Sequence, residues 1–409
     1  MTTASPTKSK PAAANTGQAI RALATTTSKA ASRAAKKNPK RTYRRWQVLV
    51  AGALVAMGIS IWGFAGRAAS LASETVADYA AATRVETIGG DLVQAQIKAT
   101  RGAPDQSANS GYGDSLTRAD EAVTKLTAAA TDGDTWPTEL NSTLSVYERT
   151  LAIAANKQSD EVVPALETAS YHLDSVVRMT SERSESLQYT AGRYSSLING
   201  LLVAAGVIGW LVVGALVGAS IWAAIASHRV INPGLAVSLI AAITLASWAS
   251  AGAATWASAE ASRSTGHVVA QARTNLSRGL LTDYQVLRST PLYPDETLLQ
   301  ADNYFDQSIW VAPRESQATD LMDSHQATAD ALTSGNWDAA AAELSVLDEY
   351  VDVLVKELDA DIEASLAPNS YAAAFVSSMN SLAAVAVLVA IAGAAAGAYG
   401  LQRRLRDFL

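Results

Sequence analysis

The sequence predicts an all-α membrane protein in which four transmembrane helices carry two tandem extracytoplasmic antiparallel four-helix bundles. Two observations predict this class. Four stretches contain no Asp, Glu, Lys or Arg and exceed the roughly 20 residues of helix that cross a hydrocarbon core; they cover 46–66, 195–228, 230–259 and 364–402. In addition, the order of apolar span, acidic helical segment and apolar span occurs twice along the chain, which indicates an internal duplication.

The duplication is visible at individual residues. One constant offset aligns a set in the first half with a set in the second: Arg84, Gly90, Leu92 and Gln96 with Arg273, Gly279, Leu281 and Gln285. A turn segment at 112–120 then matches 293–302, and Leu173–Arg178 corresponds to Val351–Lys356. We interpret the two halves as copies of one unit.

The organisation follows from these boundaries. Residues 1–45 are rich in Ala, Ser, Thr, Lys and Pro and contain too few large apolar side chains to bury a core, so we expect a disordered basic cytoplasmic tail. The remaining segments are expected in this order: TM1 at 46–66, bundle 1 at 67–196, TM2 at 197–225, a cytoplasmic linker at 226–233, TM3 at 234–256, bundle 2 at 257–374, TM4 at 375–401 and a cytoplasmic tail at 402–409.

Basic residues orient the chain. Residues 1–45 hold eleven Lys or Arg and no acid, the linker between the second and third spans holds Arg229, and the chain ends with Arg403, Arg404 and Arg406. By the positive-inside rule these three regions face the cytoplasm, which predicts a multi-pass plasma membrane protein with both termini inside. A cleaved signal peptide is the alternative interpretation of the first span.

The two long segments between the spans are acidic. Segment 67–198 has 18 acids and 11 bases, a balance of −7, and segment 257–380 has 19 acids and 6 bases, a balance of −13. An acidic exterior argues against nucleic acid as a partner. The chain contains no cysteine, so exported domains must be held by packing alone, as helical bundles are.

Within the second segment, apolar residues recur at steps of three and four and predict the buried seam of a helix; they are Leu344, Leu347, Val351, Leu354, Leu358 and Ile362. Asp295 and Asp338 are expected near helix starts, and turns are expected at 102–113, 132–137, 291–295, 312–313 and 335–336. The first and last helices of each bundle are expected to run without a break into the spans.

Small residues recur in the spans, as in Gly214-xxx-Gly218 and Gly393-xxx-Gly397. Such motifs allow close approach between helices of one chain, or of a homodimer. No span contains a charged residue, which disfavours an ion-coupled transporter.

No pattern typical of catalysis occurs. The chain lacks a phosphate-binding loop, a nucleotide-binding glycine motif, a nucleophile elbow and a kinase motif, so we expect neither an enzyme nor a cofactor. His172, His267 and His325 have no partner at ligand spacing and are interpreted as solvated side chains, with no metal site. The acids Asp348, Glu349, Asp352, Asp359, Asp361 and Glu363 are interpreted as a solvated helix face.

The best candidates for a ligand or partner site are charged residues that the duplication repeats. They are Arg84 with Arg273, Asp120 with Asp302, and Asp174 with Asp352. A guanidinium can hold the carboxylate of a small ligand with two hydrogen bonds. The alternative is structural: the repeated aspartates would then be the ion-pair partners of the repeated arginines.

Phosphorylation is a second kind of candidate site. Thr25, Thr26, Thr27 and Thr42 lie among basic residues, where a phosphate would sharply change the charge of the tail.

The layout resembles two groups of proteins. A membrane helix that continues into an external four-helix bundle and returns through a second span is similar to the sensory half of bacterial chemoreceptors and histidine kinases. The doubled unit with its basic, Ala- and Thr-rich leader resembles the GlnX family of actinobacterial membrane proteins. That resemblance implies amino acid sensing with two partners, an extracytoplasmic solute-binding protein and a cytoplasmic Ser/Thr kinase, protein kinase G.

Two functions therefore remain open. The first is a non-enzymatic transmembrane sensor and signal relay, in which ligand or binding protein favours one packing of the outer helices. The second is a structural scaffold that organises envelope partners without sensing a ligand.

Overall fold

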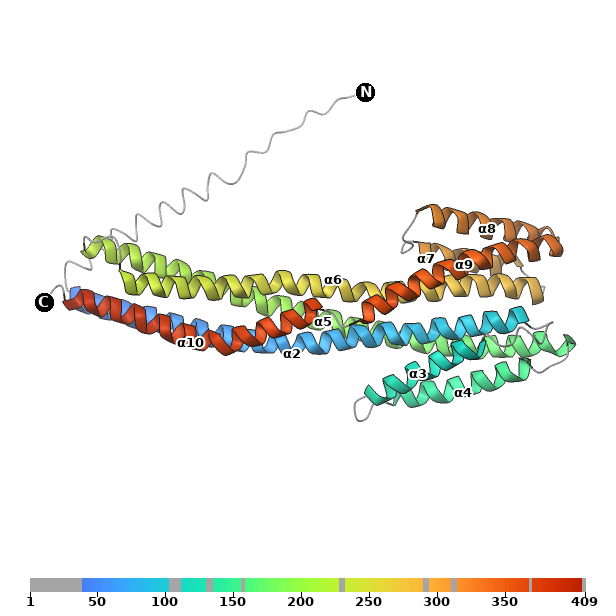
Figure 1. Ribbon diagram of the computed structural model, residues 1–409, viewed down its shortest axis with the longest axis horizontal. Coiled ribbons are helices and arrows are strands. Elements are labelled where there is room, and N and C mark those ends of the chain that lie inside the picture. The colour runs from blue at the N-terminus through green and yellow to red at the C-terminus, as the bar shows by residue number, and fades with distance from the viewer. Residues whose placement is uncertain are drawn as a thin grey trace, which may run out of the picture. The chain divides into compact units, whose positions relative to one another are not determined.

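The computed structural model describes residues 39–102, 112–129, 135–155, 159–227, 232–289, 294–309, 315–367 and 370–406 (Figure 1). Apart from short turns and caps, all of these residues are helical, and no strand occurs among them, which confirms the all-α class. The helices are α2 (Pro39–Gly102), α3 (Tyr112–Ala129), α4 (Trp136–Ala155), α5 (Ser159–Ser227), α6 (Pro233–Ser289), α7 (Pro294–Ile309), α8 (Glu315–Thr333), α9 (Trp337–Leu366) and α10 (Ser370–Arg406).

Four helical stretches are long and apolar enough to cross a membrane, which agrees with a multi-pass membrane protein. The predicted spans at 46–66, 197–225, 234–256 and 375–401 lie inside α2, α5, α6 and α10. Helix α2 begins at Pro39, earlier than the predicted boundary, and proline is favoured in the first turn of a helix. The predicted tail upstream of Pro39 lies outside the described residues, as do residues 228–231 of the predicted linker.

The chain divides into two compact units. Unit 1 comprises residues up to Ser70, Ile198–Ala254 and Phe375 onwards, and unit 2 comprises Leu71–Leu197 and Thr255–Ala374. Unit 1 therefore contains the apolar spans, and unit 2 contains both acidic segments.

Small residues bring the helices of unit 1 close together. The hydroxyl of Ser238 on α6 donates a hydrogen bond to the carbonyl of Gly393 on α10 at 2.7 Å. A Cβ added at Gly209 on α5 would lie 2.7 Å from the Cβ of Ala246 on α6. A Cβ added at Gly218, by contrast, would have nothing within 4 Å. Gly393 thus serves packing within the chain, whereas Gly218 faces away from it.

Unit 2 has one main hydrophobic core to which both acidic segments contribute. Buried side chains from α2 to α5 of the first half and α6 to α9 of the second half join in a single cluster, for example Leu92, Leu144, Leu280 and Leu347. At its periphery α3 packs on α4, α7 on α8, and α8 on α9 (Figure 1). Among the described residues, four helices of each half contribute to this one core, so two separate bundles are not seen.

The predicted seam of α9 is confirmed. Leu344, Leu347, Val351, Leu354, Leu358 and Ile362 are all buried. The helix begins at Trp337, one residue before Asp338, and the side chain of Asn336 caps it by accepting a hydrogen bond from the amide of Ala339. The predicted turn at 335–336 is present, and Gly335 adopts a φ of 72°, which glycine tolerates best.

The expectation that the last helix of the second half runs unbroken into its span is wrong. Helix α9 ends at Leu366, and Ala367 has a ψ of 154°, outside the helical region. Pro368 follows it in the sequence, and a proline disfavours helical geometry at the preceding residue. Arg263 of α6 stabilises this end, because its guanidinium donates to the carbonyls of Ser365 at 2.5 Å and Ala367 at 2.8 Å.

The close approach at Gly209 predicts a strong effect of one added methyl group. Gly209→Ala should destabilise the protein by about 1–3 kcal/mol, because its Cβ overlaps Ala246 and the helices must move apart. Gly218→Ala is the matched control on the same helix, and should be neutral or stabilising by up to about 1 kcal/mol. Thermal unfolding of both detergent-purified variants checks this; equal midpoints would contradict it.

Candidate functional site

A seam of buried polar residues runs through the core of unit 2, where α2 of the first half faces α6 of the second. On α2 these residues include Thr83, Glu86, Asp91, Gln94 and Gln96, and on α6 they include His267, Arg273, Thr274, Ser277, Thr282 and Asp283. Buried polar groups are costly unless they are hydrogen-bonded or paired. A seam of this length inside an apolar core is therefore the strongest candidate for a functional element.

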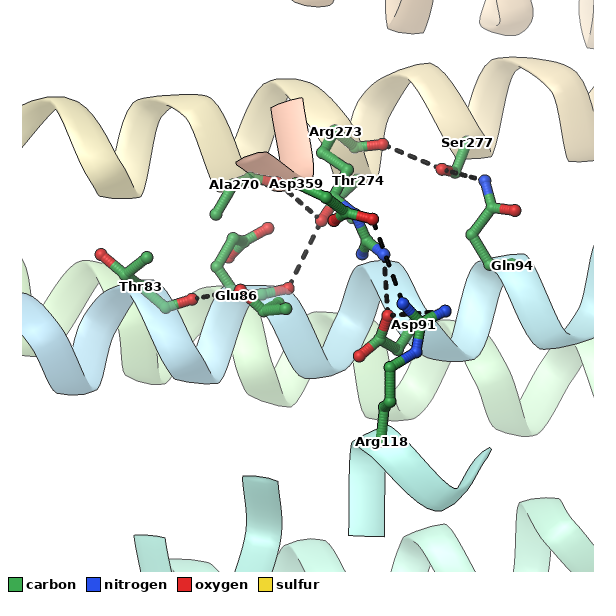
Figure 2. Close-up of polar contacts among 11 residues, drawn as sticks. Thr83, Glu86, Asp91, Gln94, Arg118, Ala270, Arg273, Thr274, Ser277 and Asp359 are labelled. Atoms are coloured by element: carbon green, nitrogen blue, oxygen red, sulfur yellow. Dashed lines mark hydrogen bonds and ion pairs between the residues drawn. The ribbon is translucent and has the colours of Figure 1, made fainter. Parts of the chain in front are cut away.

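Arg273 is at the centre of the seam (Figure 2). Its side chain is 1% exposed, and its Nη2 lies 2.7 Å from Oδ1 of Asp91 on α2. Its Nε lies 2.5 Å from Oδ1 of Asp359 on α9. Arg118 of α3 approaches the same two acids from the outside, at 3.8 Å from Asp91 and 4.0 Å from Asp359. The cluster joins four helices from both halves of the chain.

The guanidinium of Arg273 keeps its positive charge in the core. Burial alone would lower the pKa of Arg273, but the carboxylates of Asp91 and Asp359 outweigh burial and raise it. Nη1 of Arg273 has no hydrogen-bond partner among the described residues. Removing one member of a buried ion pair costs more than the pair contributes, because the other charge then stays buried alone. The paired arrangement is thus strongly preferred over a half-broken one.

The repeated glycines make room for large side chains of the second half. A Cβ at Gly90 of α2 would collide with Nη1 of Arg273, so a larger residue here would force the guanidinium to shift away from this helix. A Cβ at Gly279 of α6 would lie 2.8 Å from the ring of Phe305. The two positions have equivalent sequence contexts, but one admits a charged group and the other an aromatic ring.

The repeated glutamines meet on one serine. The amides of Gln96 and Gln285 donate to Oγ of Ser170 on α5, at 3.3 and 3.0 Å. The hydroxyl of Tyr147 on α4 donates to Oε1 of Gln96 at 3.1 Å. Equivalent residues from the two copies therefore converge in the seam, which is consistent with a duplication whose halves pack face to face.

Glu86 is a buried carboxyl group of the seam that lacks a close cationic partner in the part of the chain that the structure describes. It is 3% exposed, and its Oε2 has no hydrogen-bond partner among the described residues. Burial raises the pKa of Glu86 to about 7; hydrogen bonds from Thr274 and Ser184 and the charge of Arg278 lower it, while Glu185 raises it further. Glu86 therefore changes charge near neutral pH.

Two histidines interpreted as solvated are buried, so that interpretation is wrong for them. His267 is 4% exposed, and its Nδ1 lies 2.8 Å from Oγ of Ser184. His325 of α8 is 1% exposed, with Nδ1 2.8 Å from Asp283 and Nε2 2.9 Å from Asp302. Burial lowers the pKa of His325, but the two carboxylates outweigh burial and raise it.

The bracketed imidazole of His325 has no nitrogen left for a metal, because each ring nitrogen faces a different carboxylate. Within the described residues, no group of three or more His, Asp or Glu side chains could hold a metal ion. His172 is half-buried on α5.

The repeated charged residues that the sequence predicts as site candidates lie in different environments in the structure. Arg273 is in the buried cluster, whereas its equivalent Arg84 is half-buried and makes no ion pair with another described residue. Asp302 pairs with His325, and Asp174 lies 3.5 Å from Arg278. The repeated aspartates are therefore not the partners of the repeated arginines.

The other two aspartates differ from their equivalents in opposite ways: Asp120 is more exposed than Asp302, whereas Asp352 is less exposed than Asp174. Asp120 is exposed on α3, and its charge adds to burial in raising the pKa of Glu148. Asp352 is half-buried on α9 and likewise adds to burial in raising the pKa of Asp348. Thr42 is half-buried on α2, and Thr25, Thr26 and Thr27 lie outside the described residues.

Part of the acidic face of α9 is buried, which corrects its interpretation as fully solvated. Asp348 is 7% exposed, forms an ion pair with Arg101 and accepts a hydrogen bond from Tyr284 at 2.9 Å. Asp359 pairs with Arg273. The sequence did contain an indication of this burial. On α9, Asp348 and Asp359 are spaced by three or four residues from buried apolar residues of the same helix, such as Leu344 and Ile362.

No family model matches this chain, and the curated proteins and solved structures also contain no match to it.

The buried cluster predicts unequal effects for the repeated arginines. Arg273→Met should cost about 3–5 kcal/mol, because it leaves the buried Asp91 with only the more distant guanidinium of Arg118, at 3.8 Å. Arg84→Met is the matched control and should change stability by less than about 1 kcal/mol. Denaturant or thermal unfolding of the purified variants measures both; a loss at Arg84 as large as at Arg273 would contradict the assignment.

The raised pKa of Glu86 predicts a pH-dependent stability. An acid whose folded pKa lies above its unfolded value of 4.5 loses stability as pH rises from about 4.5 to about 7. At about 1.4 kcal/mol per unit the loss is roughly 3 kcal/mol. Glu86→Gln should remove this slope from a series of unfolding midpoints between these pH values. Glu182→Gln, an exposed change on α5, should leave the slope intact; a slope that survives in Glu86→Gln assigns it to another group.

Proposed function

We propose that this chain is a non-enzymatic transmembrane sensor and signal relay that couples an extracytoplasmic amino acid or solute-binding protein to a cytoplasmic partner. In this proposal it is a multi-pass plasma membrane protein with both termini in the cytoplasm. Unit 2 corresponds to the tandem extracytoplasmic bundles, merged around one core. Its acidic segments and the basic residues that flank the spans support this orientation.

The observation that carries the proposal is the buried cluster of Arg273, Asp91 and Asp359. Buried opposite charges are stable only where they pair closely, which happens in few alignments of one helix against another. The helices that hold them therefore favour discrete arrangements over continuous sliding. Helices α2 and α6 hold Asp91 and Arg273, and each also contains an apolar span in the same uninterrupted helix. A signal that changes the register of the seam would therefore displace the spans as well.

The resemblance to the GlnX family extends the proposal to partners. It suggests that unit 2 contacts a ligand-loaded solute-binding protein and that a Ser/Thr kinase is engaged on the cytoplasmic side, where Thr25, Thr26, Thr27 and Thr42 are candidate phosphorylation sites. The mechanism requires no catalytic residue in this chain, because the signal is a change in helix packing. A homodimer would be compatible with it.

Site-specific spin labels can test the relay. Because the chain has no native cysteine, only the introduced cysteines will be labelled. Spin labels at Arg44→Cys on α2 and Arg403→Cys on α10, both exposed positions, report the spacing of two helices of unit 1. In nanodiscs, a mixture of common amino acids, alone or with extracytoplasmic binding proteins from the native cell, should shift the distance distribution between the labels.

A label pair on one helix provides the control. Leu388→Cys with Arg403→Cys places both labels on α10, and their distance should not respond. Cross-linking of the native membrane protein, with and without amino acids, should recover a solute-binding protein and a kinase. An unresponsive label pair together with constitutive recovery of envelope-building proteins alone would favour the scaffold instead.

A further inference from the structure

A small open cavity lies on the seam of unit 2, separate from the buried charge cluster. Its volume is about 70 Å³, about the share of liquid volume that two water molecules occupy. Helices α2 and α5 of the first half and α6 and α7 of the second half line it. The lining residues are Val93, Ser170, Leu173, Asp174, Val177, Arg278, Leu281, Thr282, Gln285, Gln300 and Tyr304.

Opposite charges meet at this cavity. Asp174 is on α5 and Arg278 is on α6, so the two halves each supply one charge. The two side chains touch by one contact of 3.5 Å between Nη2 and Oδ1, and the side chain of Asp174 is 70% exposed. A solvent-accessible pair with a single long contact stabilises a protein only weakly. A ligand that offers better partners to both groups can therefore separate them at little cost.

Arg278 has a second support and does not depend on Asp174 for its position. Its guanidinium carbon lies 4.5 Å from the centre of the Tyr304 ring, within the range of a cation–π interaction. The hydroxyl of Tyr304 accepts a hydrogen bond from Gln300 at 3.1 Å. A guanidinium that is held in place before binding loses less entropy when it takes a carboxylate.

The rest of the lining is mixed. Ser170, Thr282 and Gln285 supply neutral donors and acceptors, and Val93, Leu173, Val177 and Leu281 supply apolar surface. Polar groups predominate in the lining, so hydrogen bonds and charge would set the orientation of a ligand. The limited volume admits only a few non-hydrogen atoms, so any larger part of a ligand must extend through the opening.

We propose that this cavity binds a small zwitterionic solute, with its carboxylate on Arg278 and its cationic group on Asp174. The inference deepens the proposed sensor function by giving its ligand a site and a chemical class. Such a ligand replaces the direct contact between Asp174 and Arg278 by two contacts to itself. It therefore changes the spacing of α5 and α6, and each of these helices also contains an apolar span.

Binding can be measured directly on the full-length protein in nanodiscs by titration calorimetry. Glycine and trimethylglycine are the zwitterionic probes, and acetate and methylammonium are the two half-ligands. We expect a zwitterion to bind with a Kd of about 1 mM or tighter, and each half-ligand to bind at least about tenfold more weakly. Binding of acetate as tight as that of glycine would overturn the zwitterion assignment, as would no binding of either zwitterion up to about 50 mM.

Variants assign the site. Asp174→Asn and Arg278→Gln should each weaken glycine or trimethylglycine binding by at least about tenfold. Asp352→Asn is the matched control, because Asp352 is the repeat equivalent of Asp174 and does not line the cavity; it should bind as the unaltered protein does. Asp174 is largely exposed, so its variant should fold normally, and unchanged affinity in that variant would place the ligand elsewhere.

The outcome is separable from that of the relay. Zwitterion binding without movement of the labels at positions 44 and 403 would retain the site and reject the relay. Label movement driven by another solute, without zwitterion binding, would retain the relay and reject this site.

Discussion

The arrangement of unit 2 depends on the pairing of Arg273 with Asp91 and Asp359. A guanidinium that is 1% exposed is tolerable only with its carboxylates in place, so α2, α6 and α9 must keep the register that brings them together. Gly90 belongs to the same constraint, because any larger residue would displace the guanidinium. Hydrophobic packing supplies most of the cohesion of the core, and the ion cluster selects one helix alignment among those that packing alone would allow.

The residue pattern that the two halves share shows which contacts are symmetric and which are not. Gln96 and Gln285 retain equivalent roles, since both donate to Ser170 at the seam. Arg84 and Arg273 have diverged because their surroundings differ. At the repeat offsets, Leu280 stands where the first copy has Asp91, and Ser181 stands where the second copy has Asp359. Arg84 therefore has no equivalent carboxylates to receive it, and of the two repeated arginines Arg273 is the one that belongs to the buried charge cluster.

The core of unit 2 contains several titratable side chains along α2 and α6, the two helices of the buried polar seam. Glu86 is sensitive to pH near neutrality, and Arg278 influences its pKa while also facing Asp174 at the cavity. A solute that engages Arg278 would therefore act on the charge state of the core as well as on helix spacing. The break after Leu366, held by Arg263, separates α9 from α10, so the second half does not end in one continuous helix as the first does.

The sequence by itself determined the all-α class, the four helices long and apolar enough to cross a membrane, and the apolar seam of α9, because these depend on local periodicity and on the length of charge-free runs. Only the tertiary structure decided which repeated charges are buried, that His325 lies between Asp283 and Asp302, and that Asp348 and Asp359 are not solvent-facing. The sequence of a helix shows the same acidic residue whether its side chain faces water or pairs with an arginine. The partner depends on how helices that are far apart in the sequence pack together, and local periodicity contains no information about such packing.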